Sequence, residues 1–416
     1  MRGRWSRGKM TDGWRLDTLP SDVLILIFDY CHAFDLVRLS EVCTRFHEII
    51  KDDTLWIKRS KKPIATNQVS KRFRERCNPL LCLHTKWHVT QNWQNGKYER
   101  KILLSKKTKL MPWMQLTSST LWWSGGPEIR GYRRSDPFNK SNVVFSVKHT
   151  NDVCKFIVKD DNVYCGSRDG GLQVWNRDQC CTLNIENAHN GDVHALDVTS
   201  SYSIVSGSRD GTVKIWNTTL IDVESTPPPT LHMLDRVWSL AVEPTGTKFA
   251  VGLSGVNDRI PLRIYDMECF SEPNVLVHNW RLGAGILDMV WDDPNTLLTC
   301  GYDSYTRKWD LRTASCVNIW PDPTNASIYC ISSDHHNAVI TGAQVNAKAV
   351  LWDQRQTKYV QVYFLSKRCM SGPVYSLSFD SCHLYGAMDQ SLVELKFSGY
   401  SYTENNYNEI LKFLTD

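Results

Sequence analysis

Hydrophobic and polar residues alternate along most of the chain between residues 140 and 397, in short runs separated by Gly, Asn and Asp. Examples are VHALDV at 193–198, YSIVSGS at 202–208 and TVKIW at 212–216. A period of two residues, interrupted by turn-forming residues, is typical of short antiparallel strands. Because helical spacing does not occur in this stretch, the pattern predicts a region built of strands.

One phrase appears twice within these runs. The stretches CGSRDGGLQVWNRD at 165–178 and SGSRDGTVKIWNTT at 206–219 share Gly-Ser-Arg-Asp-Gly and a later Trp-Asn. The slot held by the two tryptophans recurs along the chain at Tyr132, Trp175, Trp216, Tyr265, Trp309, Trp352 and Leu395. The successive intervals are 43, 41, 49, 44, 43 and 43 residues. Repeats of about 40–45 residues with several strands each are typical of β-propeller blades, so seven slots predict seven blades.

The repeats resemble the WD40 pattern. In that pattern an Asp in the turn before the third strand accepts hydrogen bonds from the turn and from a His in the preceding loop, and a Trp ends the third strand. One unit fills every place, with His189, Ser206, Asp210 and Trp216. Other units fill some places, with His149, Asp169 and Trp175, then Asp303 and Trp309, then Trp352. The remaining units keep the strands and lose the polar members. Since the sets recur blade by blade, we interpret them as a network that stabilises the fold, and not as catalytic triads.

A propeller must close its ring of blades. The stretch GKYERKILLS at 96–105 precedes the first full unit. We expect it to supply the outer strand of the last blade, because pairing the two ends of the propeller protects both edges.

The periodicity becomes helical between residues 16 and 59. Pro20 and Asp22 fit the start of a helix that carries Leu24, Ile27 and Phe28 on one side. A second apolar stripe has helical spacing, with Leu39, Val42, Cys43, Phe46, Ile49 and Ile50. A third short helix carries Leu55 and Trp56. Three helices in about forty residues bury little surface, so we expect this domain to present apolar residues to a standing partner.

This helical stretch is similar to the F-box. The similarity rests on Leu-Pro, an acidic residue, Leu-x-x-Ile-Phe-x-Tyr, Asp-Leu, Val-Cys and Leu-Trp in this order. Outside the generic motifs, VTQNWQNG at 89–96, MPWMQL at 111–116, DRVWSLAV at 235–242 and GAGILDMVWDDPNTLLTCGYDSYTRKWDLRT at 283–313 resemble the dactylin subfamily of F-box/WD40 proteins. The resemblance implies a fold that is mostly β, a seven-bladed WD40 propeller preceded by a small all-α F-box domain. It also implies that the F-box docks on a Skp-family adaptor through residues that include Leu19, Pro20, Leu24, Ile27, Leu36, Val42 and Trp56.

The domains follow from these boundaries. We expect a basic tail over 1–13, an F-box over 14–60, a helical or irregular linker over 61–95, the propeller over 96–397 and a C-terminal tail over 398–416. The last stretch, NNYNEILKFLTD, fits a short helix.

Composition excludes several classes of protein. The net charge of +5 is small and spread out, so a nucleic-acid partner is not required. No segment is apolar enough to span a membrane, and the N-terminus lacks the apolar stretch of a signal peptide. The 14 cysteines lack the spacing of a disulfide framework, which indicates reduced thiols in the cytoplasm or also the nucleus. Cys77, Cys82, His84 and His88 match no standard zinc spacing, and we expect neither a metal nor a cofactor.

Two positions in each blade reach the upper end of the propeller ring. One precedes the turn Asp, and the other lies early in the innermost strand. Guanidinium and aromatic residues, the types enriched at interface hot spots, hold many of these positions. The expected substrate-binding residues are Arg168, Arg209, His194, Trp238, Tyr302, Tyr329 and Tyr375. The alternative for each Arg is that it neutralises the Asp network of its own blade.

The resemblance implies a non-catalytic function. The protein is expected to be the substrate receptor of a cullin–RING ubiquitin ligase, which reaches cullin and RING subunits through the adaptor and captures protein substrates, phosphorylated ones included. Two alternatives stay open: an F-box scaffold that targets nothing for degradation, and a propeller that binds RNA or chromatin.

Overall fold

The structure is a computed structural model of the 416-residue chain. It describes residues 15–59, 62–78, 80–108, 111–135, 138–217, 227–256, 260–272, 276, 278–367 and 372–399. The predicted basic tail and C-terminal helix therefore lie outside the described residues. Contacts divide the chain into two compact units, Met1–Pro63 with Leu81–His88, and Ile64–Leu80 with Val89–Asp416. None of the described helices is both long and apolar enough to cross a membrane.

The first unit is helical. Its elements are η1 (Leu16–Thr18), α1 (Ser21–Asp29), α2 (Ala33–Leu39), α3 (Thr44–Lys51), α4 (Asp53–Ile57) and the first half of α6 (Leu83–Asn95). Pro20 caps α1, with Asp22 in the first turn, where a carboxylate faces the positive end of the helix dipole. One buried cluster joins the helices: Leu24, Phe28, Leu36, Phe46, Ile50, Leu55, Trp56 and Trp87.

The predicted single stripe from Leu39 to Ile50 was wrong, because a turn interrupts it. Helix α2 ends at Leu39, where the Ser40 hydroxyl donates to the Val37 carbonyl at 2.6 Å. Helix α3 then begins after Cys43, whose sulfur accepts from the Phe46 amide. Apolar spacing across a short turn can imitate helical spacing, and Val42 in the turn is exposed.

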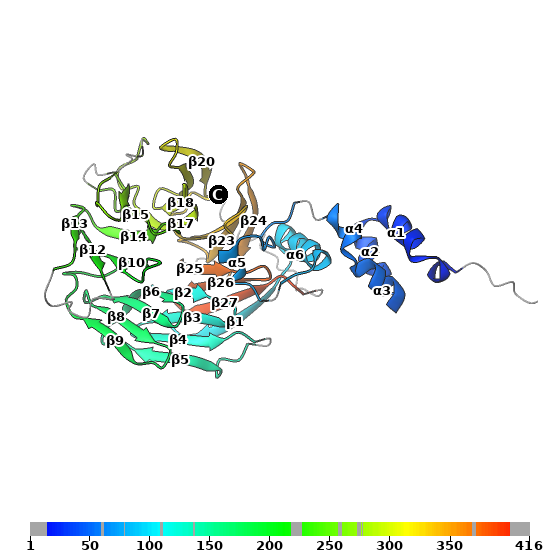
Figure 1. Ribbon diagram of the computed structural model, residues 1–416, viewed down its shortest axis with the longest axis horizontal. Coiled ribbons are helices and arrows are strands. Elements are labelled where there is room, and N and C mark those ends of the chain that lie inside the picture. The colour runs from blue at the N-terminus through cyan, green and yellow to red at the C-terminus, as the bar shows by residue number, and fades with distance from the viewer. Residues whose placement is uncertain are drawn as a thin grey trace, which may run out of the picture. The chain divides into compact units, whose positions relative to one another are not determined.

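The second unit is a seven-bladed β-propeller, as predicted (Figure 1). Blades are numbered here in chain order, and each is an antiparallel sheet. Blades 1 to 3 comprise β2 (Met114–Leu116), β3 (Thr120–Gly125), β4 (Glu128–Arg133) and β5 (Val143–Lys148); β6 (Val153–Lys159), β7 (Asn162–Ser167), β8 (Leu172–Asn176) and β9 (Cys181–Ile185); and β10 (Ala195–Val198), β11 (Ile204–Gly207), β12 (Thr212–Trp216) and β13 (Thr230–His232).

Blades 4 to 6 continue around the ring. Their strands are β14 (Val237–Val242), β15 (Lys248–Leu253) and β16 (Leu262–Asp266); β17 (Ile286–Asp293), β18 (Thr296–Gly301), β19 (Tyr305–Asp310) and β20 (Ser315–Pro321); and β21 (Ile328–Ser333), β22 (Ala338–Ala343), β23 (Lys348–Asp353) and β24 (Tyr359–Phe364). The described part of blade 4 thus has three strands.

Blade 7 closes the ring, as predicted. Its strands are β25 (Val374–Phe379), β26 (His383–Met388), β27 (Ser391–Lys396) and β1 (Glu99–Ser105). Strand β1 pairs antiparallel with β27, from Glu99 opposite Lys396 to Ser105 opposite Ser391 (Figure 1). The strand nearest the N-terminus of the propeller therefore covers the edge of its last strand.

The repeated aromatic slot falls on the third strand of every blade. Its residues lie in β4, β8, β12, β16, β19, β23 and β27. In three blades the indole Nε1–H donates, each time at 2.9 Å, to a hydroxyl on the second strand: Trp216 to Ser206, Trp309 to Thr299 and Trp352 to Thr341. The period in the sequence therefore marks one packing position.

Blade 3 holds the complete polar network. The Ser206 hydroxyl lies 2.7 Å from His189 Nε2, and His189 Nδ1 lies 3.3 Å from the carboxylate of Asp210. Asp210 also accepts from the backbone amides of Asn190 and Thr212, at 2.9 Å each. Burial lowers the pKa of His189 from 6.5 to about 4, so the ring is neutral when folded.

Stability is expected to fall as the pH drops from 7 to 5. Burial lowers the pKa of His149 and His194 to about 4 as well, whereas an unfolded histidine titrates near 6.5. Below pH 6.5 these histidines therefore become protonated in the unfolded chain but stay neutral in the folded chain. Each of these histidines is expected to lower the free energy of unfolding by about 2 kcal/mol when the pH is changed from 7 to 5. Urea unfolding at both pH values measures the slope, and His189→Asn should lower it; an unchanged slope would contradict this prediction.

Blades 5 and 6 were expected to weaken or lose the polar network, but they rebuild it with ion pairs. In blade 5, Arg307 Nη2 lies 2.6 Å from Asp303 Oδ2, and Arg307 Nε donates to His278 Nε2 at 3.2 Å. In blade 6, the ammonium of Lys348 lies 2.6 Å from Asp322 Oδ1. All four charged side chains are buried.

Candidate functional site

The innermost strands of the propeller begin around one pocket. Its volume is about 370 Å³, and we call it the upper pocket. Its lining comprises Met111, Trp113, Cys154, Lys155, His194, Trp238, Leu287, Asp288, Tyr302, Tyr329 and Tyr375. Five of the seven expected substrate-binding residues are in this lining. Arg168 and Arg209 are not, although Arg209 lies over the Trp238 ring at 5.7 Å.

Six lining residues are outside the expected substrate-binding set. Met111 and Trp113 directly precede β2 in the first blade. They lie in MPWMQL, and this blade lacks the His and Asp that mark the blades around it in the sequence. Cys154 and Leu287 lie early in the innermost strands β6 and β17, and Lys155 and Asp288 each follow one position later. The alternation rule would point them away from the pocket, but register shifts near the starts of both strands change the orientation.

Aromatic rings form an arc along one side of the pocket. Tyr302 meets Tyr329 edge to face, with centroids 6.2 Å apart, and Tyr329 lies 5.9 Å from Tyr375. Trp238 lies 5.3 Å from the ring of His194. Burial raises the pKa of all three tyrosines, so each keeps its hydroxyl proton. The arc therefore presents neutral, half-buried rings to the opening.

The two arginines share one carboxylate. Arg168 and Arg209 each place Nη1 near Asp192 Oδ2, at 3.4 and 3.2 Å, and His194 Nε2 lies 3.4 Å from the same oxygen. Their side chains stay 32% and 39% exposed. Arg209 thus pairs with an Asp in the loop that carries His189 of its own blade, whereas Arg168, in blade 2, pairs with the loop that leads into blade 3. Exposed ion pairs are weak, so either guanidinium can exchange Asp192 for another anion.

The other end of the ring is covered by residues 64–78, which we call the lower segment. Arg72 donates to the Trp291 carbonyl at 3.0 Å, and Arg76 donates to the Ser332 hydroxyl at 3.0 Å. Phe73, in α5 (Lys71–Arg74), packs on Phe379 with centroids 5.3 Å apart. These partners lie at or near the ends of innermost strands, and burial lowers the pKa of Arg76 to about 10. The upper pocket therefore lies at the end that this segment leaves open.

The helical unit presents an apolar surface of its own. Val23, Leu26, Ile27 and Tyr30 follow helical spacing along and just past α1, and all are exposed. Leu26 is 64% exposed and Tyr30 is 92% exposed. We call these four residues the α1 face. Such a stripe, opposite a buried one, is expected where a second protein covers the helix.

Of the predicted adaptor-binding residues, some are accessible and some are in the core, and only Ile27 belongs to the α1 face. Pro20, Ile27 and Val42 are exposed, and Leu19 is partly buried. Leu24, Leu36 and Trp56 have no exposed surface, so their place in the adaptor-binding set is corrected: they form the core that holds α1. Val23, Leu26 and Tyr30 of the α1 face were not predicted. The sequence was expected to place one apolar stripe on this helix, with Leu24, Ile27 and Phe28, and a second, exposed stripe was not considered.

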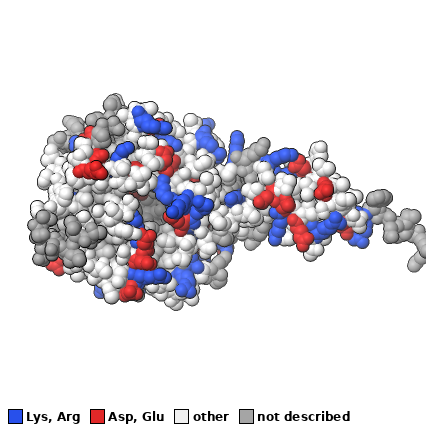
Figure 2. Space-filling view, in the orientation of Figure 1, with Lys and Arg blue, Asp and Glu red and all other residues white. Residues whose placement is uncertain are grey.

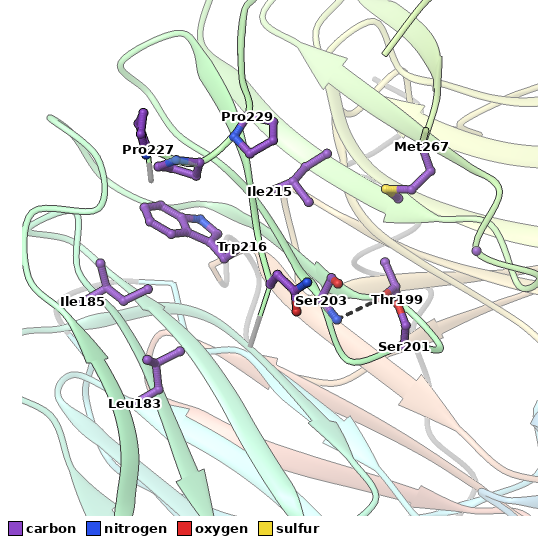
Figure 3. Close-up of a pocket in the computed structure, with 13 residues that line it drawn as sticks. Leu183, Ile185, Thr199, Ser201, Ser203, Ile215, Trp216, Pro227, Pro229 and Met267 are labelled. Carbon is purple, nitrogen blue, oxygen red and sulfur yellow. Dashed lines mark hydrogen bonds between the residues drawn. The ribbon is translucent and has the colours of Figure 1, made fainter. Parts of the chain in front are cut away.

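A second pocket lies along blade 3, with walls from blades 2 and 4 as well, and Figure 3 shows its lining. Its volume is about 400 Å³. Ile215 and Trp216 face the prolines at 227–229, and the Ser203 amide donates to the Thr199 hydroxyl at 2.9 Å (Figure 3). Its lining carries no charged side chain. It therefore lacks the ionic groups that distinguish the upper pocket.

The cysteines and histidines considered for zinc have other neighbours. Cys77 lies 3.3 Å from the Ser381 hydroxyl, whereas Cys82 contacts Thr85 and the ring of His84 packs on Trp56. Within the described ranges, no three His, Cys, Asp or Glu side chains are grouped to hold a metal ion.

Fold and surfaces together define an F-box domain followed by a WD40 propeller. Residues 16–62 match the F-box-like family, and residues 179–217 match the WD domain, G-beta repeat. The chain belongs to the F-box/WD40-repeat proteins. It is 33% identical to F-box/WD repeat-containing protein 4 of Mus musculus over 398 residues, which cover 92% of this chain and 93% of the mouse protein. The Homo sapiens protein of the same name is 32% identical, covering 92% of each chain.

Proposed function

We propose that this protein is the substrate receptor of an SCF-type cullin–RING ubiquitin ligase. The α1 face binds a Skp-family adaptor, which connects the chain to cullin and RING subunits. The upper pocket and the arginines beside it capture target proteins. The chain contributes proximity, and the ubiquitin-carrying enzyme forms the new bond.

The observation that carries this proposal is the presence of two unpartnered surfaces on two separate compact units. The α1 face is apolar and suits a constant partner. The upper pocket combines five large aromatic rings with charged side chains, the composition of interface hot spots. The lower segment covers the opposite end of the ring, which favours the upper end for capture.

Two further observations bear on partners and location. On the face shown in Figure 2, Lys and Arg are interspersed with Asp and Glu across the propeller, which favours proteins over nucleic acid as partners. Every described cysteine is a free thiol, which supports a place in the reducing cytoplasm or nucleus.

Target capture is expected to depend on the upper pocket. Arg209→Ala, Arg168→Ala and Trp238→Ala should each reduce the proteins recovered with the receptor from cells, and Trp238→Ala should reduce them most, because it removes a large ring from the arc. Adaptor recovery should stay at the wild-type level in all three. A reconstituted ubiquitin-transfer assay on the recovered proteins tests degradation; unchanged capture by all three variants would refute the proposed site.

A further inference from the structure

Lys155 is the buried cation of the upper pocket. It lies in β6, is 7% exposed and lines the pocket. The ring of Trp113 lies 4.7 Å from its ammonium. Among the described residues, no hydrogen bond or ion pair reaches this ammonium. An acceptor supplied from the pocket could therefore form a charge-assisted hydrogen bond with this ammonium.

The acids near Lys155 already have other partners. Asp288 accepts from the amides of Met289 and Ile331, at 3.0 Å each. Asp197 accepts from the amides of Val198 and Val242, at 2.8 and 2.7 Å. Each carboxylate thus ties its innermost strand to that of the next blade. Burial raises the pKa of both carboxyls, while the Lys155 charge acts in the opposite direction. Both carboxyls already accept hydrogen bonds from backbone amides, whereas the Lys155 ammonium can still donate to a ligand.

We propose that the upper pocket selects target segments by an aspartate or glutamate side chain whose carboxylate pairs with Lys155. Apolar neighbours of that acid lie on the arc formed by Trp238, Tyr302, Tyr329 and Tyr375. This inference rests on the proposed function and adds the chemistry of the recognised segment.

A carboxylate fits the charges better than the two obvious alternatives. Asp288 beside the ammonium opposes any incoming anion, and a phosphate, with up to two negative charges, meets more of this repulsion than a carboxylate with one. A cationic side chain would meet the Lys155 ammonium, a like charge in a site of low exposure. A carboxylate brings a single negative charge to the ammonium, and a volume of about 370 Å³ accommodates an acidic side chain with an apolar neighbour.

Selection from a library of random twelve-residue peptides displayed on phage tests the proposal. The full chain, bound to its adaptor, is used as wild type, Lys155→Met, Lys155→Arg and Lys159→Met. Lys159 is the matched control, because it lies at the far end of the same strand and donates to the Thr199 carbonyl at 2.6 Å. Thermal unfolding of each variant verifies that the propeller is intact.

The wild type and the control are expected to enrich peptides with Asp or Glu at one position beside apolar residues. Lys155→Met should bind these peptides at least tenfold more weakly, and Lys155→Arg should restore part of the loss. Replacing the peptide acid by its amide should weaken wild-type binding equally, and should have no effect on Lys155→Met.

Several results would overturn the proposal. They are enrichment without an acid, unchanged binding by Lys155→Met, and tighter binding of a phosphoserine peptide than of the carboxylate peptide. If Trp238→Ala still abolishes binding in these cases, the proposed capture site stands and the carboxylate assignment alone fails. If the wild type enriches no peptide, both fail.

Discussion

Replacing Leu26 and Tyr30 by aspartate is expected to abolish capture of a Skp-family adaptor. Both side chains belong to the α1 face and are mostly exposed, so the helical unit should stay folded, with a change in unfolding free energy below about 0.5 kcal/mol. Burying a carboxylate without a partner in an apolar interface is unfavourable. Each substitution should cost at least about 2 kcal/mol of binding free energy, or about 30-fold in affinity. Titration calorimetry with purified adaptor measures the loss.

Two controls separate contact from folding in this experiment. Leu234, on the propeller, is 69% exposed, and Leu234→Asp should leave adaptor affinity unchanged. Leu24 is in the core of the helical unit, so Leu24→Ala should lower stability by about 2–5 kcal/mol and reduce binding only through the folded fraction. Adaptor affinity within twofold of wild type for the double aspartate variant would exclude the α1 face as the docking surface.

Lys348→Met is expected to destabilise the propeller by about 3–5 kcal/mol. Lys348 and Asp322 form an ion pair with only 1% of each side chain exposed. Removal of the ammonium leaves a buried carboxylate without its counter-charge, which costs far more than the net stabilisation by the pair itself. Urea unfolding, followed by tryptophan fluorescence, measures the change.

A second substitution tests this explanation. The amides of Thr324 and Ala326 donate to the Asp322 carboxylate at 2.9 and 3.1 Å. Asp322→Asn removes the remaining charge but keeps a side-chain oxygen that can accept these hydrogen bonds. The double variant should therefore be more stable than Lys348→Met alone. Purely additive losses would show that the two charges act independently, and the ion-pair explanation would be wrong.

Most of the propeller could be predicted from the sequence because its packing position repeats. Trp216 and Trp352 are 136 residues apart, yet each donates its indole hydrogen bond to the second strand of its own blade. A repeat in residue type therefore indicates a repeat in the structure. The polar networks of blades 5 and 6 could not be predicted in this way. Asp322 lies in the loop before its blade and Lys348 in the third strand, and neither residue type is ordinarily expected inside a protein.

The candidate sites were predictable to a smaller extent. Positions early in the innermost strands converge by topology, so Trp238, Tyr329 and Tyr375 could be assigned to one face from sequence. Lys155 could not, because a local shift of register decides where its side chain points. The packing of the lower segment on the propeller was not predicted either. Its contacts join residues 72 and 76 to strands more than 200 residues away, and no local sequence pattern indicates such contacts.

The pairing of β1 with β27 also sets the order of events during synthesis. Residues 99–105 leave the ribosome well before their partner at 391–396 is made. Until then the growing chain carries an incomplete ring with an unpaired strand, open to other chains. A nonsense mutation at codon 391 would therefore leave both β1 and β26 with a bare edge. We expect such a truncated chain to be recovered with chaperones and aggregates instead of with target proteins.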